Sequence, residues 1–318
     1  MTDRQDTTVL YIAGAGRSGS TLLEMILGNI DGFFSVGECR HIWEYASRNT
    51  MRCGCGKGLW NCEFWHAVLG AHSRSKCRMS LETLDTLAKQ WDRTRHLPKL
   101  RLCDGRNARL QALVDATAML YREIAGRCGA QILVDASKTP SHLWILQKIP
   151  ELEIRVLHLV RDVRAVAHAW RQRRKQEYGA AGDQYRRMPR RSLLRSTAGW
   201  MVENAAAERL GTQAAGYTRM RYEDFTEAPR KVLTAALDDL GLDDPDLSFV
   251  NREGMTLQPT HSVGGNPVRF IDREFAIARD DRWRDEMRPW RQSLAGGLAR
   301  PLLNRYSYRP LTRLLHEK

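Results

Sequence analysis

The chain has 318 residues, of which 42% are hydrophobic, so it contains enough apolar material for one large α/β domain. No window approaches eighteen consecutive apolar residues, and the N-terminus is short and polar, so we expect a cytoplasmic protein without a transmembrane segment. The net charge of +13 raises nucleic acid as a partner. The arginines are spread along the chain, however, without a ribonucleoprotein or zinc-finger pattern, so nucleic acid is not expected. Seven cysteines, an odd number, indicate mostly reduced thiols.

The stretch from residue 9 to residue 23 reads VLYIAGAGRSGSTLL and predicts a strand, a glycine-rich turn and a helix that reaches Ile30. Glycines allow successive backbone N–H groups to point inward, and the N-terminus of the helix adds a partial positive charge. This combination is typical of a site for an anion. We therefore expect a ligand that carries a phosphate.

The spacing of Gly14, Gly19 and Thr21 fits the nucleotide-triphosphate loop G-x-x-x-x-G-K-S/T, except that Ser20 stands at the position of the lysine. That lysine reaches the β- and γ-phosphates of a triphosphate. Here the cation is Arg17, inside the loop. The departure favours a shorter anion, one phosphate with one more group, over ATP with magnesium.

At these residues the sequence resembles the sulfotransferases that use 3′-phosphoadenosine 5′-phosphosulfate (PAPS), in particular the tyrosylprotein and carbohydrate branch and bacterial relatives. The resemblance implies that the loop grips the donor through Gly16, Arg17, Ser18, Gly19, Ser20 and Thr21. It also implies an α/β fold of three layers, α/β/α, with a central parallel sheet related to the P-loop NTPases. We expect one domain over residues 1–318, with a cysteine- and glycine-rich and helical insertion at about 49–105 and an arginine-rich one at about 177–195.

A short strand over Phe33–Gly37 is predicted to end at Glu38. Parallel strands present their C-terminal ends on one edge of the sheet, so Glu38 should lie on the same edge as the phosphate loop, where a general base is needed. The resembling family carries a catalytic glutamate in a Gly-Glu context that Gly37 and Glu38 reproduce. The alternative is a surface carboxylate that caps a helix starting near His41.

Residues 53–66 read CGCGKGLWNCEFWH, and three thiols with His66 form a conceivable zinc site, at Cys53, Cys55 and Cys62. The C-x-C spacing is tighter than in the usual zinc knuckle, and no second pair follows. A buried thiol cluster or a local disulfide is therefore favoured, with a structural role and no metal.

Apolar residues recur at helical spacing over residues 80–95 and 106–128, and the stretch between them, His96–Gly105 with Pro98, is expected to be a loop. A buried strand, Gln131–Val134, is followed by Asp135. This pattern also resembles a magnesium-binding Walker B segment, which would suit an ATP-dependent kinase. Lys138 matches a lysine that stabilises charge on the sulfuryl oxygens in the family; the alternative is a solvated lysine.

The most strand-like run, Ile154–Val160, ends at Arg161 and opens a helix. In PAPS enzymes this junction supplies an arginine, and eight residues later a serine, to the 3′-phosphate. Arg161 matches the arginine, whereas the later position is Ala169. The resemblance also places Tyr222 near the nucleotide, although packing alone is an alternative role, and suggests that Arg269 in a loop over residues 260–270 closes over the 3′-phosphate.

The arginine-rich segment 177–195 is interpreted either as part of the acceptor entrance or as a solvated loop. Segments 193–210, 281–290 and 300–315 are expected to be helices, and 217–220 a last core strand.

Together these patterns predict sulfuryl transfer from PAPS to a hydroxyl of an acceptor, which can be a small molecule, a carbohydrate, a lipid or a natural product. In this hypothesis Glu38 removes the acceptor proton while Arg17 and Lys138 neutralise developing charge, and no metal takes part. The alternatives are an ATP-dependent small-molecule kinase of the P-loop type and a nucleic-acid or nucleotide-binding regulator. The sequence indicates neither the acceptor nor the oligomeric state.

Overall fold

A five-stranded parallel sheet forms the centre of the molecule in the computed structural model, which describes residues 7–74, 79–172, 175–178, 184–187, 189–242, 244–270, 274 and 276–308. The strand order is β2-β3-β1-β4-β7, and each neighbouring pair is parallel. The strands are β1 (Thr7–Ala13), β2 (Phe33–Gly37), β3 (Ile132–Lys138), β4 (Leu152–Val160) and β7 (Gly216–Arg221). This confirms the predicted central parallel sheet.

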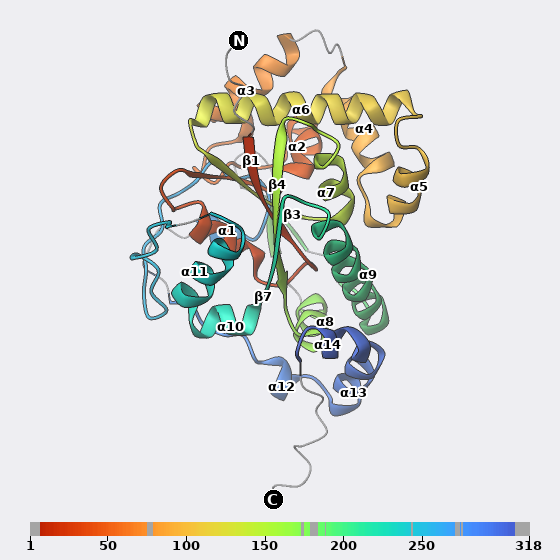
Figure 1. Cartoon of the computed structure of the whole chain (residues 1–318), viewed down its shortest axis with the longest axis vertical. Coiled ribbons are helices and arrows are strands. Elements are labelled where there is room, and N and C mark those ends of the chain that lie inside the picture. Colours follow the sequence, from red (N-terminus) through yellow and green to blue (C-terminus); the bar gives the residue numbers. More distant parts are fainter. Residues whose placement is uncertain are drawn as a thin grey trace, which may run out of the picture.

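Strand β1 shows why helices cover both faces of the sheet. Val9 and Tyr11 belong to one buried cluster, and Leu10 and Ile12 belong to another. Side chains alternate between faces along a strand, so an unbroken apolar run buries both faces. The first face packs against α6 (Ala108–Cys128), α7 (Pro140–Leu146) and α9 (Leu193–Gly211), and the second against α1 (Ser20–Leu27), α10 (Tyr222–Glu227) and α11 (Pro229–Asp239). These are the three expected layers (Figure 1).

Further helices extend the layers at both ends (Figure 1). The first group is α2 (Ile42–Arg48), α3 (Glu63–Arg74), α4 (Leu81–Trp91) and α5 (Leu97–Leu102), and the second is α8 (Val163–Arg171), α12 (Trp283–Glu286), α13 (Pro289–Leu298) and α14 (Arg300–Arg305). Short 3₁₀ turns lie at Cys39–His41, Leu59–Asn61, Thr94–His96 and Pro267–Phe270. Among the helices of the described ranges, none combines the length and the apolar character that crossing a bilayer requires.

Two local expectations differ from the structure. The predicted loop 96–105 contains α5, because Pro98 occupies the first helical turn, where its missing N–H costs nothing. In the arginine-rich segment, β5 (Lys175–Tyr178) and β6 (Gln184–Arg187) pair as antiparallel strands. Residues 179–183 and 188 of that segment, and residues 309–315 of the predicted C-terminal helix, lie outside the described part of the chain.

Candidate active site

The C-terminal ends of β1, β2, β3 and β4 surround a cavity of about 420 Å³. Most of the site residues predicted from the sequence line it: Gly16, Arg17, Gly19, Ser20, Thr21, Glu38, Lys138, Arg161 and Tyr222. Two predicted residues, Ser18 and Arg269, are not among its lining residues. The cavity therefore gathers side chains from four strand ends, as expected for the switch region of a parallel sheet.

The glycine-rich loop is curled by backbone conformations that most residues avoid. Gly14 has φ +132°, and a Cβ there would stand 2.3 Å from the Leu159 carbonyl oxygen. Gly19 has φ +93°, and a Cβ there would stand 2.6 Å from the Tyr222 ring. Arg17 also has a positive φ, +74°, although it carries a side chain. A left-handed non-glycine residue is strained, and such strain concentrates at ligand-binding sites.

Two features of the loop suit an anion. Gly19 is the N-cap of α1 and provides no side-chain hydrogen bond to the helix, so the first N–H groups depend on other acceptors. Ser18 is 1% exposed, and within the described part of the chain its Oγ has no hydrogen-bond partner. A buried polar atom without a partner is costly, so an acceptor that approaches this loop would be stabilised.

Trp170 is a site residue that the sequence analysis did not single out. Its ring lies under two guanidinium groups, with the Arg17 Cζ at 5.0 Å and the Arg191 Cζ at 3.8 Å from the ring centroid. Both contacts are cation–π interactions, and they fix two cations at the cavity wall. The signal in the sequence was the position of Trp170, next to Ala169 in the helix that Arg161 opens.

Glu38 and Lys138 meet inside the cavity as an ion pair, with the Lys138 Nζ 2.7 Å from the Glu38 Oε1. Lys138 has φ +65° at the end of β3, and its Nζ also donates to the Ala136 carbonyl oxygen at 2.7 Å. Burial acts to raise the pKa of Glu38, but Lys138, followed by His41 and Arg40, outweighs it and lowers that pKa. Glu38 is therefore ionised at neutral pH and able to accept a proton.

Two histidines near the cavity, His41 and His168, are alternative candidates for the base. His41 lies in the 3₁₀ turn Cys39–His41 and lines the cavity; burial and then Arg40 lower its pKa, so it is neutral at neutral pH. His168 is not a lining residue, and its Nε2 lies 3.0 Å from the Glu286 carboxylate. The geometry therefore leaves Glu38 and His41 in contact with the cavity.

Arg161 lies beside Tyr222, with its Cζ 4.3 Å from the ring centroid, and its Nη1 donates to the Arg17 carbonyl oxygen of the loop at 3.2 Å. Its Nη2 donates to the Asp280 carbonyl oxygen at 2.7 Å and lies 3.3 Å from the carboxylate. Its Nε is buried and has no partner within the described residues. A hydrogen bond from Arg282, together with the charge of Arg161, lowers the pKa of Asp280 to about 2. Arg161 thus offers one unpaired donor and shares its charge with an ionised carboxylate.

Arg269 is placed differently from what the resemblance implied. It is 8% exposed and donates to the backbone carbonyls of Ser262 at 2.8 Å and Arg52 at 2.7 Å. The same segment reaches the cavity through Gly265 and Asn266 instead, and the Asn266 N–H donates to the Thr21 Oγ1 at 3.3 Å. The segment around Gly265 and Asn266 therefore contacts the phosphate loop. Arg269 instead joins this late segment to the backbone at Arg52.

Asp135, the carboxylate of the Walker B-like stretch, faces the interior of the protein. It is 0% exposed, accepts from the Ser137 N–H at 2.6 Å and from the Tyr121 hydroxyl, and does not line the cavity. His142 lies 3.6 Å from it and 2.7 Å from Asp92. A carboxylate held in such a buried network is not presented to a magnesium nucleotide.

Glu203 on α9 lines the cavity together with Glu38 and Asp280, and the sequence patterns did not indicate it. Burial raises its pKa, whereas Arg191, whose Nη1 lies 3.9 Å from the Glu203 Oε1, acts in the opposite direction. A single acid in a long helical pattern carries no signal that it faces a site. The structure shows that it closes the wall beside Trp170 and Arg191.

The parallel sheet and the curled loop at its C-terminal edge define a P-loop-like α/β protein. The sulfotransferase family model matches residues 10–246, which is most of the chain, and the chain therefore belongs to the sulfotransferase family. No curated protein matches it.

Solved structures agree with this fold. The sulfotransferase domain of the Synechococcus PCC 7002 olefin synthase is 20% identical, with a TM-score of 0.50 over 98% of each chain. The sulfotransferase domain from the curacin biosynthetic pathway is 15% identical, with a TM-score of 0.50 over 95% of this chain and 98% of that chain.

Proposed function

We propose that this sulfotransferase uses PAPS as its donor and transfers the sulfuryl group to a hydroxyl of an acceptor. The observation that carries the proposal is that one cavity contains the loop of Arg17, the Glu38–Lys138 pair and Arg161. These groups supply an anion cradle, a base with a neighbouring cation, and a second cationic position.

The donor fits this cavity residue by residue. The phosphosulfate suits the curled loop, where Ser18 has an unpaired hydroxyl oxygen among the described atoms and α1 begins without a side-chain cap. The 3′-phosphate suits Arg161, whose buried Nε lacks a partner in the described structure. Arg269 is not proposed as a ligand of the 3′-phosphate, because its guanidinium already donates to two backbone carbonyls.

In the proposed reaction a bond forms between the acceptor oxygen and sulfur while the bond from sulfur to the bridging phosphate oxygen breaks. The bridging oxygen keeps that electron pair and leaves on adenosine 3′,5′-bisphosphate, and Glu38 accepts the proton of the acceptor. Lys138 donates to Glu38 at 2.7 Å, so it holds the carboxylate in place and is itself available to the sulfuryl oxygens. Arg17 adds positive charge from the loop.

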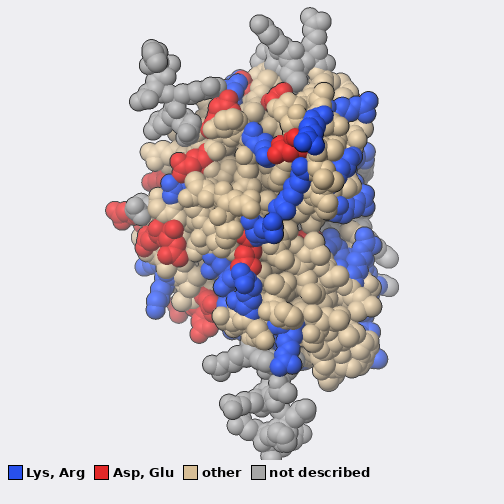
Figure 2. All heavy atoms as spheres, turned by 45° about the vertical axis from the view of Figure 1, so that its right-hand side comes forward, with Lys and Arg blue, Asp and Glu red and all other residues tan. Residues whose placement is uncertain are grey.

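Two observations support this function over the rivals. Asp135 is buried in a network with Tyr121 and His142, which disfavours a kinase that holds magnesium there. Basic side chains on the face in Figure 2 occur in separate groups, with acidic or uncharged surface between them, which supports a small anion over a nucleic acid.

Mass spectrometry tests the proposal. The protein is incubated with PAPS and a panel of hydroxyl compounds, and in a separate reaction with ATP and magnesium and the same panel. We expect a sulfate increment on an acceptor in the PAPS reaction, absent with Glu38→Gln. Modification of acceptors only in the ATP reaction would contradict the proposal.

A further inference from the structure

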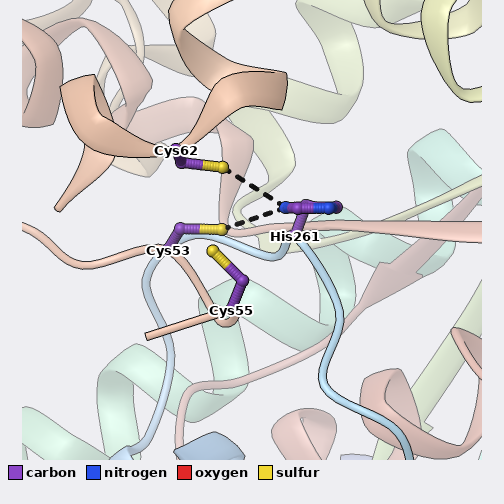
Figure 3. A group of neighbouring side chains, drawn as sticks. All are labelled: Cys53, Cys55, Cys62 and His261. Carbon is purple, nitrogen blue, oxygen red and sulfur yellow. Dashed lines mark hydrogen bonds between the residues drawn. The ribbon is translucent and has the colours of Figure 1, made fainter. Parts of the chain in front are cut away.

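Three cysteines and a histidine converge outside the active-site cavity. Cys53, Cys55, Cys62 and His261 each contribute one ligand atom, and these atoms lie within 4.8 Å of one another. Figure 3 shows the sulfur atoms directed toward a common centre beside the imidazole ring. Every cysteine in the described part of the chain is free of a disulfide. Of the two expected arrangements, a thiol cluster is present and a local disulfide is not. His66, considered above as a fourth ligand, contacts the Trp60 carbonyl oxygen instead.

We propose that Cys53, Cys55, Cys62 and His261 bind one structural zinc ion. Zinc is held by four such ligands at about 2.3 Å from sulfur and about 2.0–2.1 Å from nitrogen, in tetrahedral geometry. Those bond lengths require about 3.6 Å between sulfur and nitrogen. The Nδ1 of His261 lies 3.5 Å from the Cys53 Sγ and 3.3 Å from the Cys62 Sγ, so the distances already match.

The backbone around the thiols is built to hold them together. Residues 52–58 form a tight turn in which the Cys53 N–H donates to the Lys57 carbonyl oxygen at 2.9 Å and the Gly56 N–H donates to the Cys53 carbonyl oxygen at 2.9 Å. A Cβ on Gly54 would stand 2.4 Å from the Thr260 carbonyl oxygen, so only glycine allows the turn to lie against the segment that carries His261. The close C-x-C spacing thus places two thiols on one side of the turn.

The imidazole is oriented independently of the thiols. The His261 ring stacks on Phe64 with centroids 5.2 Å apart and an interplanar angle of 20°. Its backbone carbonyl accepts from the Trp65 Nε1–H at 2.6 Å. Ligands that are fixed before metal binding lose little freedom when the metal arrives, so this arrangement favours a tight site.

The composition of the cluster favours a closed structural site. Thiolates and imidazole select zinc over hard cations such as magnesium, and four protein ligands leave no open position for a substrate. Cys53 and Cys62 are each 0% exposed. A disulfide would use only two of the three thiols and would leave the imidazole without a role.

The position of the cluster indicates what a bound metal would do for the structure. It joins residues 53–62 to His261, which lies 199 residues beyond Cys62 in the chain. Two residues after His261, Val263 bridges both Cys53 and Gly37 and accepts from the Glu38 N–H at 2.6 Å. The metal would therefore fasten the late loop to the edge of the sheet that carries Glu38. This consequence for Glu38 rests on the proposed function, whereas the metal site itself does not.

The test uses the full chain, purified under reducing conditions with zinc supplied. Elemental analysis should find about one zinc per chain in the wild type and in the controls His66→Asn, Cys103→Ser and Cys128→Ser, as expected for a closed four-ligand site. Cys53→Ser, Cys62→Ser and His261→Ala should lose most of it. Chelation should lower the melting temperature of the wild type by several degrees and leave that of the cluster variants nearly unchanged.

Cobalt keeps the proposal testable if the variants fail to fold. Cobalt added to chelated wild-type protein should give sulfur-to-metal charge-transfer bands and the strong visible bands of a tetrahedral site, and His261→Cys should keep such a spectrum with shifted bands. A wild-type chain without zinc or a cobalt spectrum, or a Cys53–Cys62 disulfide in peptide mapping of the reduced preparation, would overturn the metal site. Neither result depends on sulfuryl transfer, so the two proposals fail separately.

Discussion

The two walls of the cavity are built in different ways. One wall is formed by the loop from Gly14 to Leu22, whose curled backbone lines the cavity. Ser18 of this loop is not a lining residue, but its buried hydroxyl has no hydrogen-bond partner among the described residues. The other wall comes from distant segments and includes Arg161 and Asp280, which contact each other. Arg269 lies outside the cavity lining, and its guanidinium donates to two backbone carbonyls.

This difference distinguishes a charge that binds a ligand from a charge that holds the protein together. An arginine that donates to backbone carbonyls inside the protein stabilises the fold. Removing such an arginine leaves the carbonyls without a donor and lowers the stability of the protein. A polar group that is buried without a partner is stabilised only when a ligand arrives. The phosphate loop and the unpaired donor of Arg161 are therefore expected to control affinity, and the fully engaged Arg269 is expected to control stability.

Substitution of Glu38, the proposed base, should give the largest loss of turnover. Its carboxylate pairs with Lys138, and its N–H donates to Val263 of the late segment. Glu38→Gln keeps the shape and removes the basicity, so turnover should fall by roughly 10²–10⁴, the usual range for a general base, while donor affinity stays near wild type. Steady-state kinetics and titration calorimetry measure the two quantities. If Glu38→Gln keeps most of the activity while His41→Ala abolishes it in a folded protein, His41 is the base.

Arg17 and Arg269 test this contrast directly. Arg17→Ala should weaken PAPS binding by about 1.5–3 kcal/mol, the value of a charged hydrogen bond, and lower turnover with it. Arg269→Ala should leave affinity within about twofold and instead lower the free energy of unfolding by roughly 1–3 kcal/mol, because the Arg52 carbonyl loses the Arg269 donor and the Ser262 carbonyl keeps only the Gly54 N–H. Calorimetry and urea unfolding measure these outcomes. An equal loss of affinity in a stable Arg269→Ala protein would contradict the contrast.

The sequence predicted the features that local patterns determine and missed the contacts between distant segments. Strand β2 has the bounds expected for it, and Glu38 lies at the predicted sheet edge, because local periodicity and parallel topology determine both. The role of Arg269, the pairing of Arg161 with Asp280 and the contact of His261 with the thiols depend on segments far apart in the chain. No local pattern encodes such contacts. The imidazole nearest in sequence, His66, was therefore the wrong one to group with the thiols.

Substitutions of Arg161 and Asp280 should change the affinity for PAPS by a smaller factor. Arg161→Ala should reduce affinity for PAPS about tenfold and hardly change affinity for the analogue without the 3′-phosphate. Asp280→Asn removes the competing carboxylate and should raise affinity by up to about fivefold, because a partly exposed ion pair is worth about 0.2–1 kcal/mol. Calorimetry with both ligands measures the two ratios. Equal losses for both ligands in Arg161→Ala would assign Arg161 a structural role.

The buried network of His142, Asp92 and Asp135 predicts the smallest effect, a dependence of stability on pH. Burial acts to lower the pKa of His142, but Asp92 and Asp135 outweigh it and raise that pKa to about 9. Burial acts to raise the pKa of Asp92, but the charge of His142, followed by that of Arg40, outweighs burial and lowers this pKa to about 2. The histidine contribution is complete below its unfolded pKa of about 6.5 and is lost as pH rises through about 9. The Asp92 contribution is present above about 3.9 and is lost as pH falls through about 2.

Stability should therefore be greatest between about pH 4 and pH 6.5 and should fall by about 1–2 kcal/mol on going to pH 9.5. Urea unfolding at these pH values measures the change, with His142→Gln as the variant in which the alkaline decrease should be smaller. The same alkaline decrease in wild type and His142→Gln would show that another group causes it.

The most direct test of the central claim is titration calorimetry of the wild-type protein with adenosine 3′,5′-bisphosphate, adenosine 5′-phosphate and ATP with magnesium. Because the loop is proposed to bind the 5′-phosphosulfate and Arg161 the 3′-phosphate, the bisphosphate should bind without metal and at least tenfold more tightly than the monophosphate, as one charged contact would give. ATP with magnesium should bind more weakly than the bisphosphate. Equal binding of bisphosphate and monophosphate, or tightest binding of ATP with magnesium, would contradict the proposal that this sulfotransferase takes PAPS as its donor.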